Sequence, residues 1–472
     1  MTCSRLLSFV ASLTLCACHT PPRVTSNTTI AVPATWQTST AAGARDDAAL
    51  VEWWTRFDDP VLTAVITAAL HSSPNVRTAF SRITESRARR SVARAPLFPS
   101  LSTTVSGGGS RTRDHATNLT TSREYYAGGL DASWQVDLFG LQRQTLAATS
   151  ADLAQTAENF YGVKVSLAAE VASAYVTLRS AEAQLAVVQL SLGTRRETVQ
   201  LTHLREQVGT GDGLDTQQAV SSLEQTRASI PALQLTIAQT RYQLALLAGR
   251  TPGSLDPLLA APSAIPTPPV DIALGVPAET LRQRPDVRAA EQGVLAATAR
   301  TSAARRQRWP TFTLTGSLGV TAAHPEGLFS PESTLASLLG SLTAPIFSSG
   351  RISKNISIKT EQERQALIAY ESTVFIALAE VEDALAAARY HAERAALLER
   401  AVAAAAAATH LFALRYEAGQ VDLFVSLDAQ RTLLAVEQQQ ITTAADRATA
   451  SIRLYQTLGG GWSPLSSSVS PP

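Results

Sequence analysis

The sequence predicts a mainly α-helical chain that also carries four short β-strands and is built as a tandem duplication. Apolar residues recur at intervals of seven over two long proline-free stretches, which is typical of helices that pack as coiled coils. Short motifs recur about 210 residues apart, which indicates that the second half of the chain repeats the first. Four polar segments of about 10 residues alternate in character, which favours strands.

The duplication is seen in motifs that keep their register. Residues 74–77 (Pro-Asn-Val-Arg) recur at 285–288 (Pro-Asp-Val-Arg), and residues 98–101 have their counterpart at 309–312, both after 211 positions. Four further residues recur 210 positions later: Arg205, Gly209, Asp212 and Ala219. We therefore predict a first repeat over 46–250 and a second over 276–460. A Pro-rich linker over 251–275 joins them, and a flexible tail over 461–472 follows.

The beginning of the chain resembles an export signal. One basic residue, Arg5, precedes an apolar stretch from Leu6 to Leu15. Leu15 and Ala17 stand three and one positions before Cys18, as in the bacterial lipobox, where the new N-terminal cysteine receives lipid. We expect a signal peptide over 1–17, lipidation of Cys18 and a lipid-anchored segment over 18–45. The alternative is an ordinary signal peptide with incidental cysteines.

Each repeat is expected to open with a helix and two strands. The helices lie at roughly 74–96 and 285–307 and end before prolines, which cannot continue a helix. Polar segments rich in Thr, Ser and Gly follow, and alternate residues in them share one character. We place strands at about 98–109, 125–136, 311–321 and 334–344. A tilted strand of about 10 residues is long enough to cross a bilayer.

A long helical hairpin completes each repeat. Leu146, Leu153, Phe160 and Leu167 show the spacing of seven in the first long helix, over about 141–208, and the second covers about 351–416. At about 1.5 Å per residue, such a helix reaches roughly 100 Å. A glycine-bearing turn ends each long helix, and returning helices follow over about 215–248 and 422–458.

Composition excludes several classes of protein. The 40 Lys+Arg nearly balance the 39 Asp+Glu, which argues against a nucleic-acid-binding protein. Hydrophobic residues make up 45% of the chain, yet no run of 18 apolar residues follows the export signal, so we expect no membrane-spanning helix. Removal of the signal would leave Cys18 as the last of the three cysteines, which excludes a disulfide framework.

No catalytic or metal-binding pattern is found. The seven histidines are scattered without the spacing of metal ligands. Gly209, Gly211 and Gly213 could suggest a phosphate-binding loop, but they follow a helix and lack the Lys-Ser/Thr ending, so a hairpin turn is favoured. Glu380, Glu382 and Asp383 are expected to be solvated helix charges. We expect no enzymatic activity, no cofactor and no metal.

Four strands cannot close a barrel on their own. Open sheet edges are not tolerated in lipid, and spanning barrels start at about 8 strands. Membrane strands in this chain would therefore require several copies, and the apolar faces of the long helices also call for neighbours. An oligomeric barrel continued by a helical tube satisfies both requirements.

One motif also points to a family. Residues 284–291 read RPDVRAAE, which closely resembles a signature of TolC-family outer-membrane factors, specifically the NodT-type efflux lipoproteins. Further matches lie at 134–140, 230–233, 247–253, 345–351 and 415–422, and the resemblance covers about 45–460. It implies a mainly α fold with membrane β-structure: a homotrimer with a 12-stranded outer-membrane β-barrel and a periplasmic α-barrel of 12 helices.

The resemblance implies a function and partners. The chain would be the outer-membrane exit duct of a tripartite efflux system, passively exporting small molecules such as drugs. Its partners would be further copies of itself, a periplasmic adaptor, an inner-membrane pump of the RND type and outer-membrane lipid. The alternatives are the duct of a protein secretion system and a non-conducting, envelope-spanning coiled-coil structural protein.

The resemblance also assigns residues at the hairpin turns. Asp215, Tyr416 and Asp428 match family positions at the periplasmic gate. Val421 and Val425 stand where an Arg and a second Asp are found, so a hydrophobic constriction is an alternative barrier. The alternative role for Asp428 is an acid at a helix N-terminus. The expected adaptor contacts are Gly209, Thr210, Gly211, Gly419, Gln420 and Val421.

Overall fold

In the computed structural model, residues 33, 35–37, 50–261, 263–268 and 281–462 are described. The predicted signal peptide, the lipidation site Cys18, most of the segment up to 45, part of the linker and nearly all of the tail lie outside them. All elements below belong to the unit of residues 33–472.

The order of elements repeats along the chain. The first half contains η1 (Trp53–Phe57), α3 (Pro60–Ser72), α4 (Pro74–Arg94), η2 (Ala95–Leu97), β1 (Ser100–Arg113), β2 (Thr120–Val136), α5 (Leu141–Gln207) and α6 (Gly213–Leu247). The second half, after α7 (Asp256–Leu259), contains α9 (Pro285–Arg306), β3 (Thr311–Ala322), η3 (Pro325–Phe329), η4 (Pro331–Ser333), β4 (Thr334–Thr343), α10 (Arg351–Glu417) and α11 (Leu423–Thr457). Each predicted helix and strand is present.

The helix α3 was not predicted, although the sequence marks its start. Asp59 is the N-cap, and its Oδ1 accepts from the backbone N–H groups of Val61 (2.9 Å) and Leu62 (3.0 Å). Pro60 follows at the first helical position, where its missing N–H costs nothing. The buried face of α3 enters the main hydrophobic core, in which the Trp53 ring stacks on Tyr455 at 5.4 Å between ring centres.

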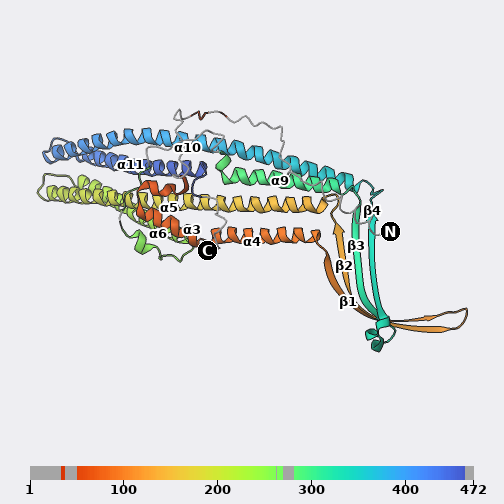
Figure 1. The fold of residues 1–472 in the computed structure, drawn as a ribbon. Helices are drawn as coiled ribbons and strands as arrows, with labels where there is room; N and C mark the ends of the chain where they lie inside the picture. Colours follow the sequence, from red (N-terminus) through yellow and green to blue (C-terminus); the bar gives the residue numbers. More distant parts are fainter. Residues whose placement is uncertain (1–32, 34, 38–49, 262, 269–280, 463–472) are drawn as a thin grey trace. The chain divides into compact units, whose positions relative to one another are not determined.

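The four strands form one antiparallel sheet in the order β1-β2-β3-β4. The central pairing of β2 with β3 joins the two repeats, with Leu130 opposite Leu318. A Cβ atom on Gly129 would lie 3.1 Å from the Cα atom of Gly319, so the close approach of these strands requires glycine. β1 and β2 are longer than predicted, and their outer parts pair only with each other as a hairpin that projects past β3 and β4 (Figure 1).

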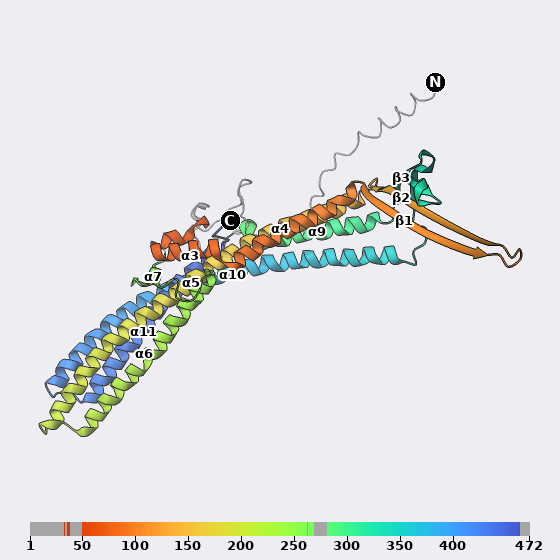
Figure 2. The same cartoon turned by 90° about the horizontal axis from the view of Figure 1, so that it is seen from below.

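The helices place the sheet and the hairpin turns at opposite ends. Figures 1 and 2 show α5 with α6 and α10 with α11 as two long hairpins side by side, whose turns point away from the sheet. The α4 and α9 helices pack along α5, and α9 also packs along α10. The main core lies between these ends, where α3, α5 and α11 meet.

The segment predicted as a linker is packed at its beginning. Leu255 (2% exposed), just before the short helix α7, and Leu259 (0%), the last residue of α7, lie in the main core. The buried Arg179 of α5 donates from Nη1 to the carbonyl oxygen of Leu259 (3.5 Å). Proline richness therefore does not mean that this stretch is unpacked, since its leucines bury apolar surface. The boundaries of the repeats and linker stay a prediction.

One described helix is apolar enough to cross a membrane by length and composition. It is α10, in which an 18-residue window reaches a mean hydropathy of 1.4 and is not buried within the chain. The expectation that no helix spans a membrane stays a prediction, because length and composition alone do not make α10 a membrane span. That expectation rested on uninterrupted apolar runs, whereas α10 contains the shorter alanine-rich segment 401–408, which includes Val402 and lies between Arg400 and Thr409.

Candidate functional site

Directly opposite residues of paired strands share one face of a sheet. By this rule the register gives the sheet one apolar face and one polar face. The apolar face carries Leu101, Val105, Leu130, Trp134, Val136, Phe312, Leu314, Leu318, Val320, Ala336, Leu338 and Leu342. The opposite face carries Ser102, Thr104, Ser106, Asp131, Ser133, Gln135, Thr313, Thr315, Ser317, Ser337 and Ser341, with Leu335 and Leu339 of β4 as apolar exceptions. Val105 (84%) and Leu338 (77%) on the apolar face are largely exposed. Such a face suits lipid, and the hydroxyl-rich face suits water.

The outer edges of the sheet lack backbone partners among the described residues. β1 pairs only with β2, and β4 pairs only with β3. Their free N–H and C=O groups cannot remain unpaired in hydrocarbon, where each unsatisfied group costs several kcal/mol. A sheet of this kind can enter a membrane only when its edges pair with strands of other chains.

Aromatic side chains mark the junction between sheet and helices. Phe139 and Trp309 stack with ring centres 5.4 Å apart, and Trp309 is 55% exposed. The Arg94 guanidinium lies 5.4 Å from the ring centre of Phe98, and Phe347 is 87% exposed. Belts of aromatic residues occur at membrane–water interfaces. The junction between sheet and helices therefore marks one end of the apolar face of the sheet.

The predicted adaptor contacts lie at the two hairpin turns, at the end of the helices away from the sheet. Gly209 (φ +74°) and Gly419 (φ +71°) end the long helices in the left-handed region, which favours glycine. Backbone N–H groups of Thr210 and Gln420 donate to the carbonyl oxygens of Arg205 and Arg415, each at 2.9 Å. The predicted tip residues are exposed except Val421, which is half-buried.

Tyr416 is buried rather than exposed on a free surface. It is 6% exposed and packs in a small cluster with Ala219, Leu423 and Leu427, with Val421 partly buried beside them. The Arg205 guanidinium lies 4.5 Å from the centre of the Tyr416 ring. Arg205 of the first hairpin thus contacts the end of the second hairpin at Tyr416.

The two predicted gate aspartates differ in setting. Asp215 is half-buried in the first turn of α6. Asp428 is exposed, and its Oδ1 lies 3.5 Å from Nη1 of Arg431. Because α11 begins at Leu423, Asp428 is beyond the first turn, where the helix dipole has faded. No hydrogen bond or ion pair joins Asp215, Tyr416 and Asp428 within the described chain, so their shared role stays a prediction.

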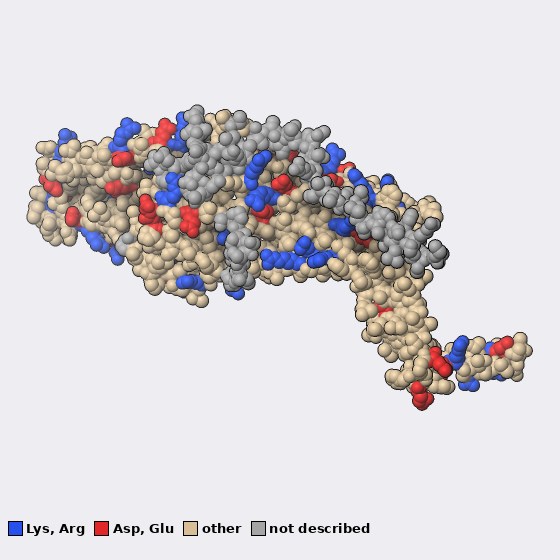
Figure 3. Space-filling model, viewed as in Figure 1, with Lys and Arg blue, Asp and Glu red and all other residues tan. Residues whose placement is uncertain are grey.

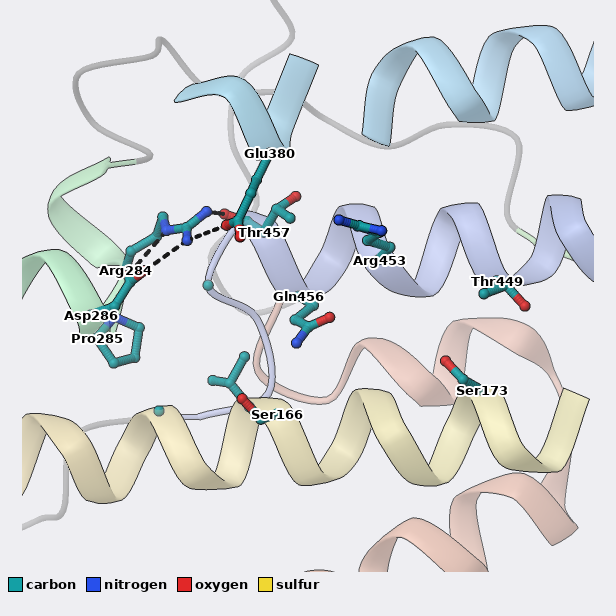
Figure 4. A pocket seen from close by; sticks show the side chains of 13 residues that line it. Ser166, Ser173, Arg284, Pro285, Asp286, Glu380, Thr449, Arg453, Gln456 and Thr457 are labelled. Atoms are coloured by element: carbon teal, nitrogen blue, oxygen red, sulfur yellow. Dashed lines mark hydrogen bonds and ion pairs between the residues drawn. The ribbon is translucent and has the colours of Figure 1, made fainter. Parts of the chain in front are cut away.

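The arginine of the RPDVRAAE motif holds the second repeat together beside a cavity of about 480 Å³ (Figure 4). Arg284 is 6% exposed, and its Nη2 lies 2.7 Å from Asp286 and 2.6 Å from Glu380 of α10. Its Nη1 donates to the carbonyl oxygen of Thr457 at 3.0 Å, at the end of α11. Burial disfavours the charged form, but the hydrogen bonds and charges of the two carboxylates outweigh it and raise the pKa of Arg284.

These contacts correct the view of two acids as merely solvated. Glu380 binds Arg284, and the Oε1 atom of Glu382 accepts from the backbone N–H of Gln37 at 2.7 Å. Asp383 is exposed, as expected. Sequence reasoning missed these pairings because Arg284 and Glu380 are 96 positions apart. The recurring motif around Arg284 was the available signal.

A second ion pair links the two repeats. Arg288 of α9 donates from Nη2 to Oε1 of Glu158 on α5 at 2.6 Å. The other carboxylate oxygen of Glu158 is buried without a hydrogen-bond partner among the described residues. Desolvation by burial raises the pKa of Glu158, and Arg288 opposes this only in part.

The described residues contain no group of three or more His, Cys, Asp or Glu side chains that could hold a metal ion. The arrangement instead offers a two-faced sheet at one end and two tight turns at the other. The capped turns and the ion pairs of Arg284 and Arg288 are structural.

Comparison with known proteins identifies relatives over most of the chain. A profile of the family described as outer membrane efflux protein matches residues 65–250 and 276–460. The toluene efflux pump outer membrane protein TtgF of Pseudomonas putida is 31% identical over 421 residues, covering 88% of this chain and 87% of that protein. The pyoverdine export outer membrane protein OpmQ of Pseudomonas putida is 32% identical over 462 residues, 96% of each chain. The solved outer-membrane channel OprN has a TM-score of 0.86 at 30% identity, covering 94% of this chain and 99% of that one.

Proposed function

The chain belongs to the outer membrane efflux protein family, and from that premise we propose that three copies assemble into the exit duct of a tripartite efflux system. Its location in the outer membrane, its mainly helical fold with α-barrel and β-barrel parts, and its role in efflux were all predicted from the sequence, and all are confirmed. The homotrimer, the lipid anchor, the adaptor and pump, and the roles of single residues are our proposals.

The observation that carries the proposal is the two-faced sheet with two open edges. Three copies of four strands give 12 strands, which lies within the range of spanning barrels. Pairing β1 of one copy with β4 of the next satisfies both edges and closes the ring. The apolar face then meets lipid, and the polar face lines a water-filled lumen.

The long helices support the same assembly. No residue of the apolar window of α10 is fully buried within the described chain, although α11 packs along the helix, and a helix of another copy would bury the rest of this surface. Four hairpin helices per copy, α5, α6, α10 and α11, give 12 helices in a trimer. The 67 residues of α5 extend about 100 Å at about 1.5 Å per residue, enough to carry the lumen well below the membrane.

The hairpin turns are the proposed docking surface and gate. We assign the contact with a periplasmic adaptor to Gly209, Thr210, Gly211, Gly419, Gln420 and Val421, because these residues form the outermost turns. In the gate, Tyr416 would set the spacing of the hairpins from inside the cluster, while Asp215 and Asp428 would present carboxylates at the mouth. Three like charges around a pore favour cations.

A passive duct requires neither catalysis nor a cofactor. We propose that an inner-membrane pump of the RND type selects the cargo. Relatives of nearly equal identity are named for toluene and for pyoverdine export, which is what a duct serving different pumps would give. Lipid on Cys18 would anchor the chain to the outer membrane.

Native mass spectrometry in mild detergent, followed by recording in planar bilayers, tests the proposal. A trimer that conducts ions is expected. A monomer, or a trimer without conductance, would contradict it, and the second result would favour a structural coiled coil. Asp428→Ala tests the gate separately: unchanged single-channel conductance and unchanged drug tolerance of cells would remove Asp428 from that role.

A further inference from the structure

The four-stranded part of the sheet contains a single side chain that is charged at neutral pH. Along residues 100–107, 126–136, 311–322 and 334–343, all of them described, the side chains are apolar, hydroxyl or amide except for Asp131 of β2. Other charged residues of these strands, Arg111, Arg113, Arg123 and Glu124, lie in the outer hairpin. Figure 3 agrees, since the sheet shows almost no charged atoms between the charged helices and the charged hairpin tip.

The register places Asp131 on the polar face. It stands between Ser102 of β1 and Ser317 of β3, in rows of serine and threonine. The hydroxyl of Thr104 donates to its Oδ2 at 3.0 Å, and the hydroxyl of Ser102 donates to its backbone oxygen at 3.4 Å. The carboxylate is thus held among neutral hydroxyl groups, with no cation paired to it in the described strands.

We propose that Asp131 sets the charge selectivity of the barrel lumen, by favouring cationic over anionic solutes at the level of the membrane. This inference rests on the proposed trimeric channel. In that assembly three copies of Asp131 form a carboxylate ring on an otherwise uncharged wall. The ring is distinct from the gate, because Asp131 lies in the sheet, whereas Asp215 and Asp428 lie beside the hairpin turns at the far end of the helices.

The width of such a barrel, compared with the Debye length, decides at which salt concentrations the carboxylate ring acts on ions throughout the lumen. Twelve strands spaced about 4.8 Å apart and tilted by about 40° enclose a cylinder about 24 Å across at the backbone. The lumen axis therefore lies about 10 Å from the carboxylates. The Debye length is about 8 Å at 0.15 M salt and about 30 Å at 0.01 M. The ring should act across the whole lumen in dilute salt and only near the wall in concentrated salt.

Reversal potentials of the purified trimer in planar bilayers test this assignment. With KCl at ~10 mM and ~100 mM on the two sides, the wild type is expected to prefer K⁺ over Cl⁻. Asp131→Asn, which keeps the shape of the side chain, should lower the permeability ratio by about twofold or more. The difference should vanish when both solutions approach ~1 M, where the Debye length is about 3 Å.

Matched variants identify the charge as the cause. Asp131→Glu should keep the ratio of the wild type. Ser133 lies two positions along the same face, so Ser133→Asp should raise the ratio, and combined with Asp131→Asn it should restore selectivity. The Ser133→Asp measurement also stands if Asp131→Asn fails to assemble. Ser133→Asn controls for side-chain size.

The outcomes separate this inference from the proposed function. A conducting trimer whose selectivity is the same with Asp131→Asn as in the wild type would overturn the assignment. So would a selectivity that disappears with Asp428→Asn and survives Asp131→Asn, since the charge would then act at the turns. Absence of conductance from the wild-type trimer would instead overturn the proposed channel.

Discussion

The guanidinium of Arg205 covers the Tyr416 ring at 4.5 Å and caps the helix that carries this residue. Its Nη2 donates to the carbonyl oxygens of Tyr416 (3.1 Å) and Glu417 (3.0 Å), at the end of α10. The carbonyl oxygen of Tyr416 also accepts from the backbone N–H of Gly419 (3.0 Å), so Arg205 adds a second donor there and supplies a side-chain donor to Glu417 at the end of the helix. The relative position of the two turns depends on Arg205.

Removing this side chain should loosen the turns. Arg205→Ala deletes a cation–π contact and two charged hydrogen bonds, together about 2–3 kcal/mol. We expect hydrogen exchange of backbone amides in 416–423 to become about 30- to 150-fold faster, while amides of the main core are unchanged. Arg227→Ala is the control, because the Arg227 side chain is 66% exposed and, among the residues that the structure describes, forms an ion pair only with Glu224 on its own helix. Equal exchange in both variants would show that Arg205 does not couple the hairpins.

Two substitutions at Gly419 distinguish the effect of backbone strain from the effect of side-chain size. A Cβ atom there would meet nothing within 4 Å, but the φ of +71° disfavours any residue with a side chain. Gly419→Ala should cost about 1–2 kcal/mol and retain export, because alanine adds strain without bulk. Gly419→Trp should carry similar strain, preserve trimers and abolish export by blocking the adaptor. Drug tolerance of cells, with trimers quantified in the same membranes, gives the answer; normal export by the tryptophan variant would contradict the docking surface.

Adjacent residues of β4 test the two faces of the sheet. Leu338 lies on the apolar face and Ser337 on the polar face. An arginine on the lipid side of a barrel costs up to about 2–4 kcal/mol near the bilayer midplane, whereas the lumen side tolerates charge. Leu338→Arg should therefore sharply reduce the trimer recovered from outer membranes, and Ser337→Arg should leave most of it. If Ser337→Arg reduced the amount of trimer more than Leu338→Arg, our assignment of the two faces would be wrong.

Glu158 predicts a pH dependence of stability. Burial raises its pKa in the folded chain above the ordinary value of 4.5, so the folded state binds this proton more tightly than the unfolded state. The stability that the protonated form supplies is accordingly present below about pH 4.5, is lost as the pH rises through the folded pKa, and does not change further above it. Glu158→Gln removes that loss and can still accept a hydrogen bond from Arg288. The melting temperature of the variant minus that of the wild type should rise between about pH 4.5 and 7; a difference that falls would mean that the ion pair with Arg288 dominates.

The elements that could be predicted have local signals. The two long helices were predicted to within one residue at each end, since heptads without proline continue a helix and Gly209 and Gly419 end it. The alternation in β3 also predicted its apolar face correctly, with Phe312 and Leu318 on the same side. The helix α3 had such a signal too, in Asp59 and Pro60, and could have been found.

The features that were missed depend on distant parts of the chain. β1 continues to Arg113 and β2 begins at Thr120, beyond the predicted ends. Both faces of these outer parts are exposed, so no alternation of apolar and polar residues marks them in the sequence. The partner of Glu380 is set by how α9 meets α10, which no local pattern reveals. The position of Asp131 among hydroxyl groups likewise becomes visible only once the register of three strands is known.

The open edges of β1 and β4 also have a consequence for genetics. In the proposed ring of three, every subunit supplies both edges, so one subunit with a broken edge prevents its two intact partners from closing the ring. If sound and defective chains are made equally and mix at random, only about one ring in eight is free of defective chains. Alleles that break an edge strand should therefore be dominant in a cell that also carries the intact gene, whereas alleles that merely stop synthesis should be recessive.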